Sequence, residues 1–407
     1  MTSSVPEGLS AFRDLRVIEL GVWVAAPSAA ALLADWGADV IKIEAPSGDP
    51  MRAAFASIGF GDVPNPAFAL DNRGKRSVVL DLRDEEGRAR LEELLATADV
   101  FVSNLRPDAL DSLDLEAEAT LARHPHLVYC SVSGYGLRGE DRNRPAYDVG
   151  AFWARSGLSS QLSDQAGVPL NVRGGIGDHI SGLTALAGIL GAVIEQRHTG
   201  EGRVVEVSLQ RTGAYVLGWD LSLQSGLGKV AGSEPRHAIQ TPLMNSYQAS
   251  DGKWFFFTAL EAGRHLENIY KALERPDLLD DERFQSAKSL RKHRSEVISV
   301  LDEIVATQPL AYWAKRFDDH GVWWAPVQTP PEVLADPQLL ANDGFIEIDD
   351  PENPVHWAVN GPISFSDLPV ARAAAAKAPL LGEHTEAVLA ELRDAARGDA
   401  ARGDVGA

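Results

Sequence analysis

The first half of the chain alternates short apolar runs with helix-length segments, and this pattern constrains the fold more than any other feature. The apolar runs have the length of strands and are rich in Val, Ile and Leu; they span residues 15–20, 38–44, 77–82, 99–103 and 127–132. Helices are expected at residues 27–36 and 85–97. Strands that alternate with helices in this way are typical of βαβ units, in which the strands are parallel. We therefore predict an α/β fold with a doubly wound parallel sheet.

The turn after the first strand bears on the ligand that such a sheet binds. A dinucleotide-binding sheet carries G-x-G-x-x-G at this place, because its glycines let the backbone approach a pyrophosphate. Residues 21–27 read GVWVAAP and lack the pattern. A nucleotide-dependent oxidoreductase is therefore disfavoured.

In the second half of the chain, the regular alternation of strands and helices gives way to other patterns. A further strand is predicted at residues 204–209 and a helix at 211–226, after which residues 242–259 predict antiparallel strands around a turn at 250–253. A helical region with polar surfaces follows over residues 263–314. Because 407 residues are too many for one small core, we expect two domains.

The charge balance limits the partners of this chain. It carries 58 acidic against 38 basic residues, a net charge of −20, which repels nucleic acid and anionic membranes. We expect neither as a partner. An anionic ligand would need a local basic patch, for which the N-terminal half offers candidates: Lys42, Arg52, Arg73, Lys75, Arg76, Arg106 and Arg138.

Cysteine content and the N-terminal residues predict a cytoplasmic protein. The single cysteine, Cys130, excludes an internal disulfide and lies in an apolar strand, where a packed thiol is expected rather than a nucleophile. Residues 1–7 lack the features of a signal peptide, and no apolar run approaches the length of a membrane span. No metal-ligand spacing is found, so neither a metal nor a tightly bound cofactor is expected.

A glycine-rich segment precedes a helix predicted at residues 183–196. Residues 174–182 read GGIGDHISG and place Asp178 at the start of this helix. Free N–H groups and the helix dipole favour an ionised carboxylate there, and the glycines permit close approach of a ligand. Such a carboxylate can attack an activated acyl group as a nucleophile. From these residues alone, a role for Asp178 as a simple helix cap remains open.

Eight short strings stand in an order that resembles one known family. They are residues 33–46 (LADWGADVIKIEAP), 48–52 (GDPMR), 72–77 (NRGKRS), 104–110 (NLRPDAL), 131–136 (SVSGYG), 177–178 (GD), 199–202 (TGEG) and 378–385 (APLLGEHT). Together they resemble the class III coenzyme A transferases, the CaiB/BaiF family, over almost the whole chain.

The resemblance implies a particular architecture. Both ends of the chain would form a large CoA-binding α/β domain, with a smaller α+β domain inserted between them. We expect residues 1–225 to form the first part of the large domain, 226–325 the small domain, and 326–407 a segment that returns to the large domain. The resemblance also implies a homodimer whose two subunits are threaded through each other as interlocked rings.

The resemblance further implies the chemistry. Asp178 would be the nucleophile that moves coenzyme A from an acyl-CoA to a free carboxylic acid, through an aspartyl anhydride and an aspartyl-CoA thioester. Gly177, Tyr147 and Asp148 would support it. Coenzyme A and acyl-CoA enter as substrates, and the residues expected to bind them are Trp23, Val24, Ala25, Arg73, Lys75, Arg76, Asn104, Leu105, Arg106 and Arg138. Ala45 stands where some members have an arginine that packs on the adenine.

Two alternatives stay in view. Racemases of the same family carry a His-Asp pair where this chain has Tyr147-Asp148, and a tyrosine with an ordinary pKa near 10 replaces a histidine poorly as a base. A CoA transferase is therefore preferred over an acyl-CoA racemase. A non-catalytic CoA-binding protein would keep the basic patch but would not need Asp178 in its glycine setting.

The substrate acid is less constrained. Residues 152–157 and 236–243 resemble the subgroup that includes phenyllactate and related aryl-acid CoA transferases. Aromatic side chains offer a wall for a bulky acyl group, although buried aromatics are also ordinary core; they are Trp23, Phe152, Trp153 and Trp219. Residues 231–236 replace a glycine run that forms a lid in many members.

Overall fold

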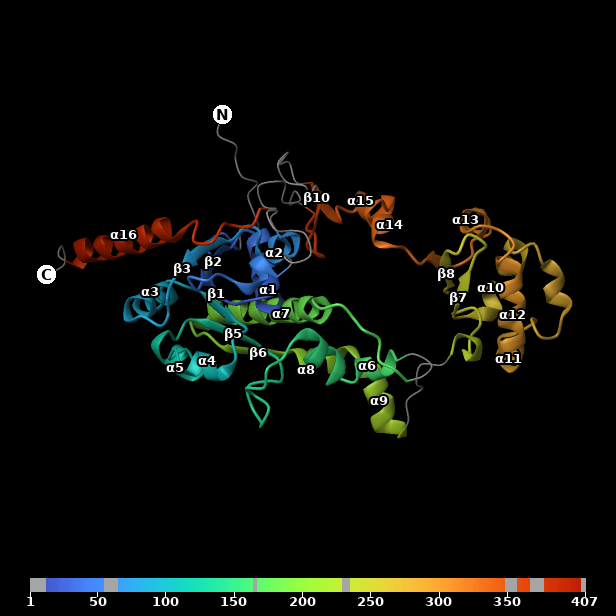
Figure 1. Cartoon of the computed structure of the whole chain (residues 1–407), viewed down its shortest axis with the longest axis horizontal. Coiled ribbons are helices and arrows are strands. Elements are labelled where there is room, and N and C mark those ends of the chain that lie inside the picture. The colour runs from blue at the N-terminus through green and yellow to red at the C-terminus, as the bar shows by residue number, and fades with distance from the viewer. Residues whose placement is uncertain are drawn as a thin grey trace, which may run out of the picture. The chain divides into compact units, whose positions relative to one another are not determined.

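The structure, a computed structural model, describes residues 12–54, 65–163, 167–228, 235–347, 357–366 and 377–403 (Figure 1). The chain divides into two compact units. The large unit contains the chain up to residue 160, residues 170–228 and the chain from residue 338 onward; the small unit contains residues 161–169 and 229–337. The large unit thus includes both ends of the chain, and the small unit reaches beyond residue 325, where its end was predicted.

The large unit is built on a six-stranded parallel sheet with the strand order β3-β2-β1-β4-β5-β6. The strands are β1 (Arg16–Leu20), β2 (Asp39–Glu44), β3 (Arg76–Val79), β4 (Val100–Ser103), β5 (Val128–Ser133) and β6 (Val204–Ser208). Chain order reverses between β1 and β4, so the loops that leave these two strands diverge. In open α/β sheets, ligands bind in the crevice at this switch point. The predicted doubly wound sheet is confirmed.

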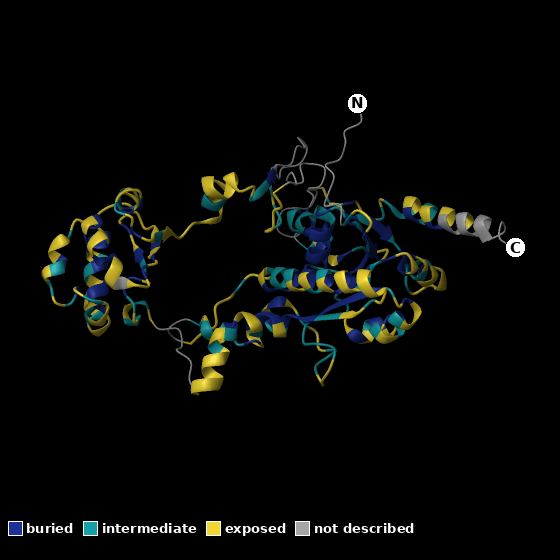
Figure 2. Cartoon of the chain, turned by 180° about the vertical axis from the view of Figure 1, so that it is seen from behind, coloured by how far each residue is buried: buried dark blue, intermediate teal, exposed yellow. Residues whose placement is uncertain are grey.

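Both faces of the sheet are covered by helices, because successive side chains of a strand point to opposite faces and both sets are apolar. One face packs against α1 (Ala25–Asp35) and α7 (Ile176–Thr199). The other packs against a second layer: α3 (Glu85–Ala96), α4 (Pro107–Asp111), α5 (Ala117–Arg123) and α16 (Thr385–Gly403). Figure 2 shows the strands as a buried layer between these helices.

The helix α7 begins at Ile176, earlier than predicted, and its glycines fit it to α1. A Cβ at Gly182 would collide with Ser28 Oγ. By length and composition, α7 is also apolar enough to cross a membrane, contrary to the prediction that no such segment exists. Its residues Leu186 and Ile189 are nevertheless buried in the core of the large unit. They pack there against the sheet and α1.

The segment that leads into α16 closes the β3 edge of the sheet. His384 N donates to Ser77 O at 2.9 Å, and Ser77 N donates to His384 Nδ1 at 3.2 Å. Thr385 Oγ1 accepts from Val79 N at 3.0 Å. Unpaired groups of an edge strand are thereby satisfied by residues from the end of the chain. In Figure 1, α16 lies in red beside β3 and α3.

The small unit is an α+β structure with an antiparallel sheet in the order β7-β8-β9. Its strands are β7 (Ser246–Gln248), β8 (Trp254–Phe257) and β9 (Trp324–Pro326). One face of the sheet forms a core with α10 (Ala262–Ala272), α12 (Arg294–Val305) and α13 (Leu310–Asp319). The predicted hairpin around residues 250–253 is confirmed. The segment that replaces the glycine run of other members, residues 231–236, lies largely outside the described residues, since only Pro235 and Arg236 of it are described.

Further helices and strands lie in both units, and β10 and β11 form a separate two-stranded sheet. These further elements are η2 (Pro50–Ala53), α2 (Pro66–Asn72), η4 (Val149–Ala154), α6 (Leu158–Gln161), α8 (Leu209–Val216), α9 (Gly218–Leu227), η5 (Arg236–Ala238), η6 (Pro276–Asp280), α11 (Ala287–Lys292), α14 (Pro330–Leu334), α15 (Pro337–Ala341), β10 (Phe345–Glu347) and β11 (Trp357–Val359). The helix predicted at residues 211–226 is therefore two helices that meet at Leu217.

Candidate active site

Two neighbouring pockets open at the switch point of the large sheet. The first has a volume of about 580 Å³ and is lined by Leu20, Gly21, Val22, Ile43, Glu44, Ala45, Pro46, Ser47, Gly48, Asp49, Leu80, Asp81, Leu82, Arg83, Leu105 and Leu113. The second has a volume of about 320 Å³ and is lined by Val22, Trp23, Val24, Ala25, Asn104, Leu105, Arg106, Val132, Ser133, Gly134, Pro145, Ala146, Tyr147, Asp178 and Leu209. Val22 and Leu105 line both pockets, so the two pockets are adjacent.

The turn after β1 forms the wall between the pockets, and it is held by side chains from other strands. Asn104 Oδ1 accepts from Val22 N at 2.9 Å, and Asn104 Nδ2 donates to Val22 O at 2.7 Å. Trp23 has a left-handed backbone, with φ of 64°. Its ring meets the ring of Tyr147 edge-on, with centroids 5.8 Å apart. Trp23 and Tyr147 thus form an aromatic wall of the second pocket.

Asp178 lies in the first turn of α7 and lines the second pocket. The helix begins after Gly175, which adopts a φ of 95° that favours glycine. A Cβ at Gly177 would collide with Asp148 Oδ1 and with the ring of Phe152. Glycine at this position therefore lets the first turn of α7 pack directly on Asp148.

The environment of Asp178 favours its protonated form. Burial, and then the negative charge of Asp148, raise the pKa of Asp178 to about 7; Asp71 adds to the rise and His179 opposes it. This corrects the prediction that the helix N-terminus holds the carboxylate ionised, since burial and neighbouring acids outweigh the free N–H groups. Near neutral pH the carboxyl group of Asp178 is poised between its two forms.

Asp148 is a buried acid beside this group. Burial raises its pKa, while the backbone N–H groups of Gly177 and Gly175 and the indole of Trp153 oppose the rise. Two carboxyl groups in one small space disfavour simultaneous ionisation. The charge on Asp148 therefore influences the protonation of Asp178.

His179 supplies a charge of the opposite sign. Its Nε2 lies 2.9 Å from Asp71 Oδ1, and Asp71 is buried at the end of α2. Burial disfavours the charged imidazole, but the hydrogen bond and charge of Asp71 raise the pKa of His179. The site thus combines an acid with a raised pKa, a second acid and a histidine held by a third acid.

The comparisons with known proteins identify the family. The family model described as CoA-transferase family III matches residues 12–385. The chain belongs to CoA-transferase family III, and it is a transferase enzyme.

Relatives and solved structures agree with this assignment. The chain is 34% identical to cinnamoyl-CoA:phenyllactate CoA-transferase of Clostridium sporogenes, over 94% of this chain and 93% of that protein. It is 31% identical to (R)-2-hydroxy-4-methylpentanoate CoA-transferase of Clostridioides difficile, over 93% and 94% of the two chains. The structure resembles a CaiB/BaiF family protein from Brucella suis with a TM-score of 0.83 and 28% identity, over 95% of this chain and all of that one.

In this family III CoA-transferase, many of the predicted site residues meet in the second pocket. Those that line it are Trp23, Val24, Ala25, Asn104, Leu105, Arg106, Tyr147 and Asp178. Arg106 is exposed there, and no ion pair joins its side chain to another residue that the structure describes. The segments that follow β1 and β4 bring these residues together, except for Tyr147, which precedes η4, and Asp178, which lies in α7.

The other predicted cations lie outside both pockets. Arg73 is 2% exposed and bonds Asp35 through two nitrogens, and Lys75 is fully buried against Glu19. The half-buried Arg76 pairs with Asp39 and Glu391 at 2.6 Å, and the exposed Arg138 pairs with Glu206 at 3.2 Å. The prediction of one basic patch is therefore corrected, because partners distant in sequence hold these cations. They are left out of the site proposed below.

The four aromatic residues predicted to wall the acyl pocket lie in different environments. Trp23 lines the second pocket, while Phe152 and Trp153 are buried in the core of the large unit. Trp219 is 82% exposed on α9. Of the four, only Trp23 lines either of the two pockets described above.

Two features of the site escaped the sequence analysis. Arg83 lines the first pocket next to Asp81, and nothing in its surroundings distinguished it from a surface charge. The contact between Asp71 and His179 joins residues 108 positions apart, which no local signal indicates. The predicted packed thiol is confirmed: Cys130 is buried, and burial raises its pKa to about 12. Among the described residues, no group of three or more His, Cys, Asp and Glu side chains could hold a metal ion.

Proposed function

We propose that Asp178 carries out CoA transfer as a covalent nucleophile. The observation that supports this most strongly is the position of Asp178 in the lining of the second pocket, in the first turn of α7. A carboxylate suits the role because the anhydride it forms is reactive enough to be reversed.

The first half of the reaction loads the enzyme with CoA. A carboxylate oxygen of Asp178 attacks the thioester carbonyl, and the carbon–sulfur bond breaks to give an aspartyl–acyl anhydride and the CoA thiolate. The thiolate then attacks the aspartyl carbonyl of the anhydride. The donor acid leaves as its carboxylate, and Asp178 is left as a CoA thioester.

The second half repeats these steps in reverse. The carboxylate of the acceptor acid attacks the aspartyl-CoA thioester, which gives a new anhydride and frees the CoA thiolate. The thiolate attacks the acyl carbonyl of the acceptor, releases the new acyl-CoA and restores the Asp178 carboxylate. One thioester is consumed and one is formed, so the exchange needs no external energy source.

The two pockets suit the two ends of an acyl-CoA. We place the nucleotide in the first pocket, the pantetheine arm along Val22 and Leu105, and the thioester beside Asp178 in the second. Arg106 and Arg83 are cations at the pockets that can meet phosphates. Ala45 lines the first pocket and offers only a small side chain to the adenine.

The acyl end of the site favours a bulky or aromatic acid. Trp23 and Tyr147 present aromatic edges beside Asp178. The relative from Clostridium sporogenes is named for cinnamoyl and phenyllactate groups. We therefore propose an aryl or branched carboxylic acid as acceptor or donor. Racemisation is less favoured, because no histidine lines the second pocket within the described residues.

Mass spectrometry tests this proposal directly. Incubation with cinnamoyl-CoA, quenching and proteolysis should yield a CoA adduct on the peptide that contains Asp178, and the Asp178→Asn variant should yield none. Addition of phenyllactate should discharge the adduct and produce a second acyl-CoA. A panel of acyl-CoA donors with no adduct and no exchange would contradict the proposal. Exchange of the α-proton in D₂O without transfer would instead support a racemase.

We also propose that the enzyme works in the cytoplasm as an interlocked homodimer. The small unit is inserted between parts of the large unit, a chain order that allows threading. Large apolar side chains on α8 and α9 are exposed in the single chain, notably Tyr215 at 87% and Trp219 at 82%. Such exposure is unusual for a monomer. The single cysteine, Cys130, cannot form an internal disulfide, which fits the cytoplasm.

A further inference from the structure

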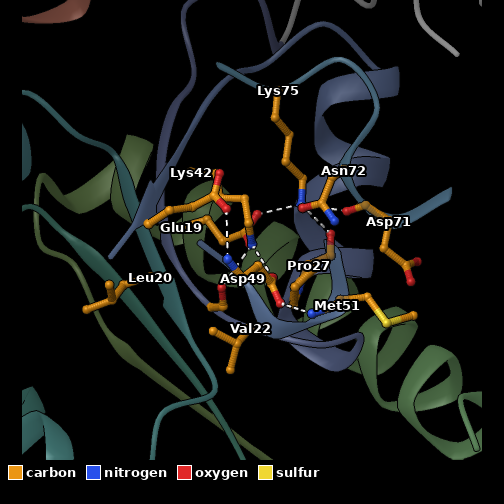
Figure 3. Close-up of polar contacts among 12 residues, drawn as sticks. Glu19, Leu20, Val22, Pro27, Lys42, Asp49, Met51, Asp71, Asn72 and Lys75 are labelled. Carbon is orange, nitrogen blue, oxygen red and sulfur yellow. Dashed lines mark hydrogen bonds and ion pairs between the residues drawn. The ribbon is translucent and has the colours of Figure 1, made fainter. Parts of the chain in front are cut away.

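Four buried charged side chains form a chain of ion pairs near the turn after β1, and one of them, Asp49, lines the first pocket (Figure 3). Lys42 Nζ lies 2.8 Å from Glu19 Oε1 and 2.9 Å from Asp49 Oδ2. Lys75 Nζ lies 2.5 Å from Glu19 Oε2. All four side chains have no exposed surface, and two positive charges balance two negative ones. Ion pairs this deep are costly to bury, and apolar residues would often be as stable in their place.

The chain of charges ends on the backbone of the pocket wall. Asp49 Oδ1 accepts from Trp23 N at 3.1 Å and from Met51 N at 2.9 Å. Lys42 Nζ also donates to Gly21 O at 2.9 Å. Lys42 therefore holds the first residue of the turn Gly21–Val22–Trp23, and Asp49 holds the last.

Trp23 is in an unfavourable conformation that needs such support. A bulky residue with a φ of 64° lies in the left-handed region, which side chains other than glycine seldom adopt. Such strain persists only where the surroundings determine the backbone, and it concentrates at functional sites. Here it aims the indole at Tyr147.

We infer that the Glu19–Lys42–Asp49 chain is a positioning device that holds Trp23 in its left-handed conformation as the wall of the acyl pocket. Asp49 acts through the Trp23 N–H, Lys42 fixes Asp49, and Glu19 holds Lys42 with Lys75 as its counterion. Trp23 thereby selects among acyl groups. The selectivity part of this inference rests on the proposed function, whereas the conformational part does not.

The conformational part is tested by melting temperature at one fixed protein concentration. Trp23→Gly and Trp23→Ala remove the same indole, but only glycine tolerates the left-handed backbone. Trp23→Gly should therefore melt at least about 2 °C above Trp23→Ala. In the Asp49→Ala background this difference should shrink to less than half, because the released turn can relax. Equal melting of the two Trp23 variants, or an undiminished difference in that background, would overturn the inference.

Asp114 is the matched control. It has a φ of 56° on an exposed turn, far from the buried charges in sequence. Asp114→Gly should also melt above Asp114→Ala, and Asp49→Ala should leave that difference unchanged. If Asp49→Ala yields no folded protein, the comparison of melting temperatures between Trp23→Gly and Trp23→Ala alone tests the conformational part of the inference.

The selectivity part is tested by a double-mutant cycle on donor preference. The measured quantity is the ratio of kcat/KM for cinnamoyl-CoA to that for acetyl-CoA. Trp23→Gly should change this ratio at least about tenfold, and Asp49→Ala should change it in the same direction. In the Trp23→Gly background, Asp49→Ala should alter it less than twofold. Effects that multiply would show that Asp49 does not act through Trp23. Failure of the Asp178 adduct with the expected melting order would refute the proposed function but not the positioning device.

Discussion

Asp71 Oδ1 lies 2.9 Å from His179 Nε2, so an acid from α2 holds the histidine that adjoins Asp178 in α7. The site thus places a positive group and a negative one, Asp148, in opposition around one carboxyl group. The opposing effects of Asp148 and His179 on the pKa of Asp178 determine the pH above which Asp178 is ionised and can act as a nucleophile.

The rate of transfer should rise with pH through about 7. Asp178 must lose its proton to attack, and burial with the charge of Asp148 raises its pKa to about 7. Asp148→Asn should move this limb of the kcat/KM profile to lower pH, and His179→Asn should move it to higher pH. Profiles measured between pH 5 and pH 9 with one donor would check both shifts. A limb that stays in place in both variants would show that Asp178 does not govern it.

Asp178→Asn should abolish transfer and yet stabilise the fold above neutral pH. A carboxyl group whose native pKa exceeds its unfolded value binds protons more tightly in the native state, so stability falls as pH rises from about 4 to about 7. The variant removes this penalty. Its melting temperature should exceed that of the wild type at pH 8, and the difference should narrow toward pH 4. A variant less stable than the wild type at pH 8 would contradict this account. A separate expectation concerns binding. Asp178→Ala should bind free CoA with a dissociation constant within a few-fold of that of the wild type, because a nucleophile need not anchor the nucleotide.

Arg106→Ala should weaken the binding of free CoA by about 1–3 kcal/mol, the usual effect of losing a charge-assisted contact with a phosphate. Arg138→Ala is the control, because Arg138 is equally basic but lies outside both pockets. Calorimetry on both variants separates a specific contact from a change in net charge. Equal losses in the two variants would remove Arg106 from the site.

Gly177→Ala should destabilise the protein by roughly 1–3 kcal/mol, because its Cβ would meet Asp148 and Phe152. Gly191 lies on the same helix, exposed and with open space around it. Gly191→Ala should therefore be neutral or stabilising by about 0.5–1 kcal/mol. Urea denaturation of the pair checks the difference. Similar stabilities would mean that the first turn of α7 does not pack closely on Asp148.

The proposed interlocked dimer should persist at nanomolar concentration. Threaded subunits cannot separate without substantial unfolding, so dilution alone should not release a monomer. Mass photometry measures this directly. A folded, active monomer would rule out the threaded arrangement.

Much of the sheet could be predicted because its signal is local. Buried parallel strands are continuous apolar runs, and β2 was expected at residues 38–44 and is found at Asp39–Glu44. The start of α7 was missed for a physical reason. Glycine-rich residues 174–182 resemble a loop, whereas here Gly177 and Gly182 make room for Asp148 and Ser28.

The ion pairs and pKa shifts of the site could not be predicted, because they depend on residues that are close in the folded structure but distant in the sequence. Arg73 looks like a free cation in the sequence, yet Asp35, 38 positions away, binds it. Local reasoning assigned Asp178 an ionised carboxylate from its place in a helix. Burial and Asp148 outweigh that effect, and neither is visible in the nine residues around Asp178.

The contact between Ser77 and His384 also determines when the large sheet can be completed during synthesis. The edge of β3 is completed by a residue 307 positions later in the chain. During synthesis, every residue of the small unit leaves the ribosome before the large unit can close. A nascent chain therefore holds an unfinished sheet edge throughout that interval, and a message truncated before His384 would leave the edge open permanently.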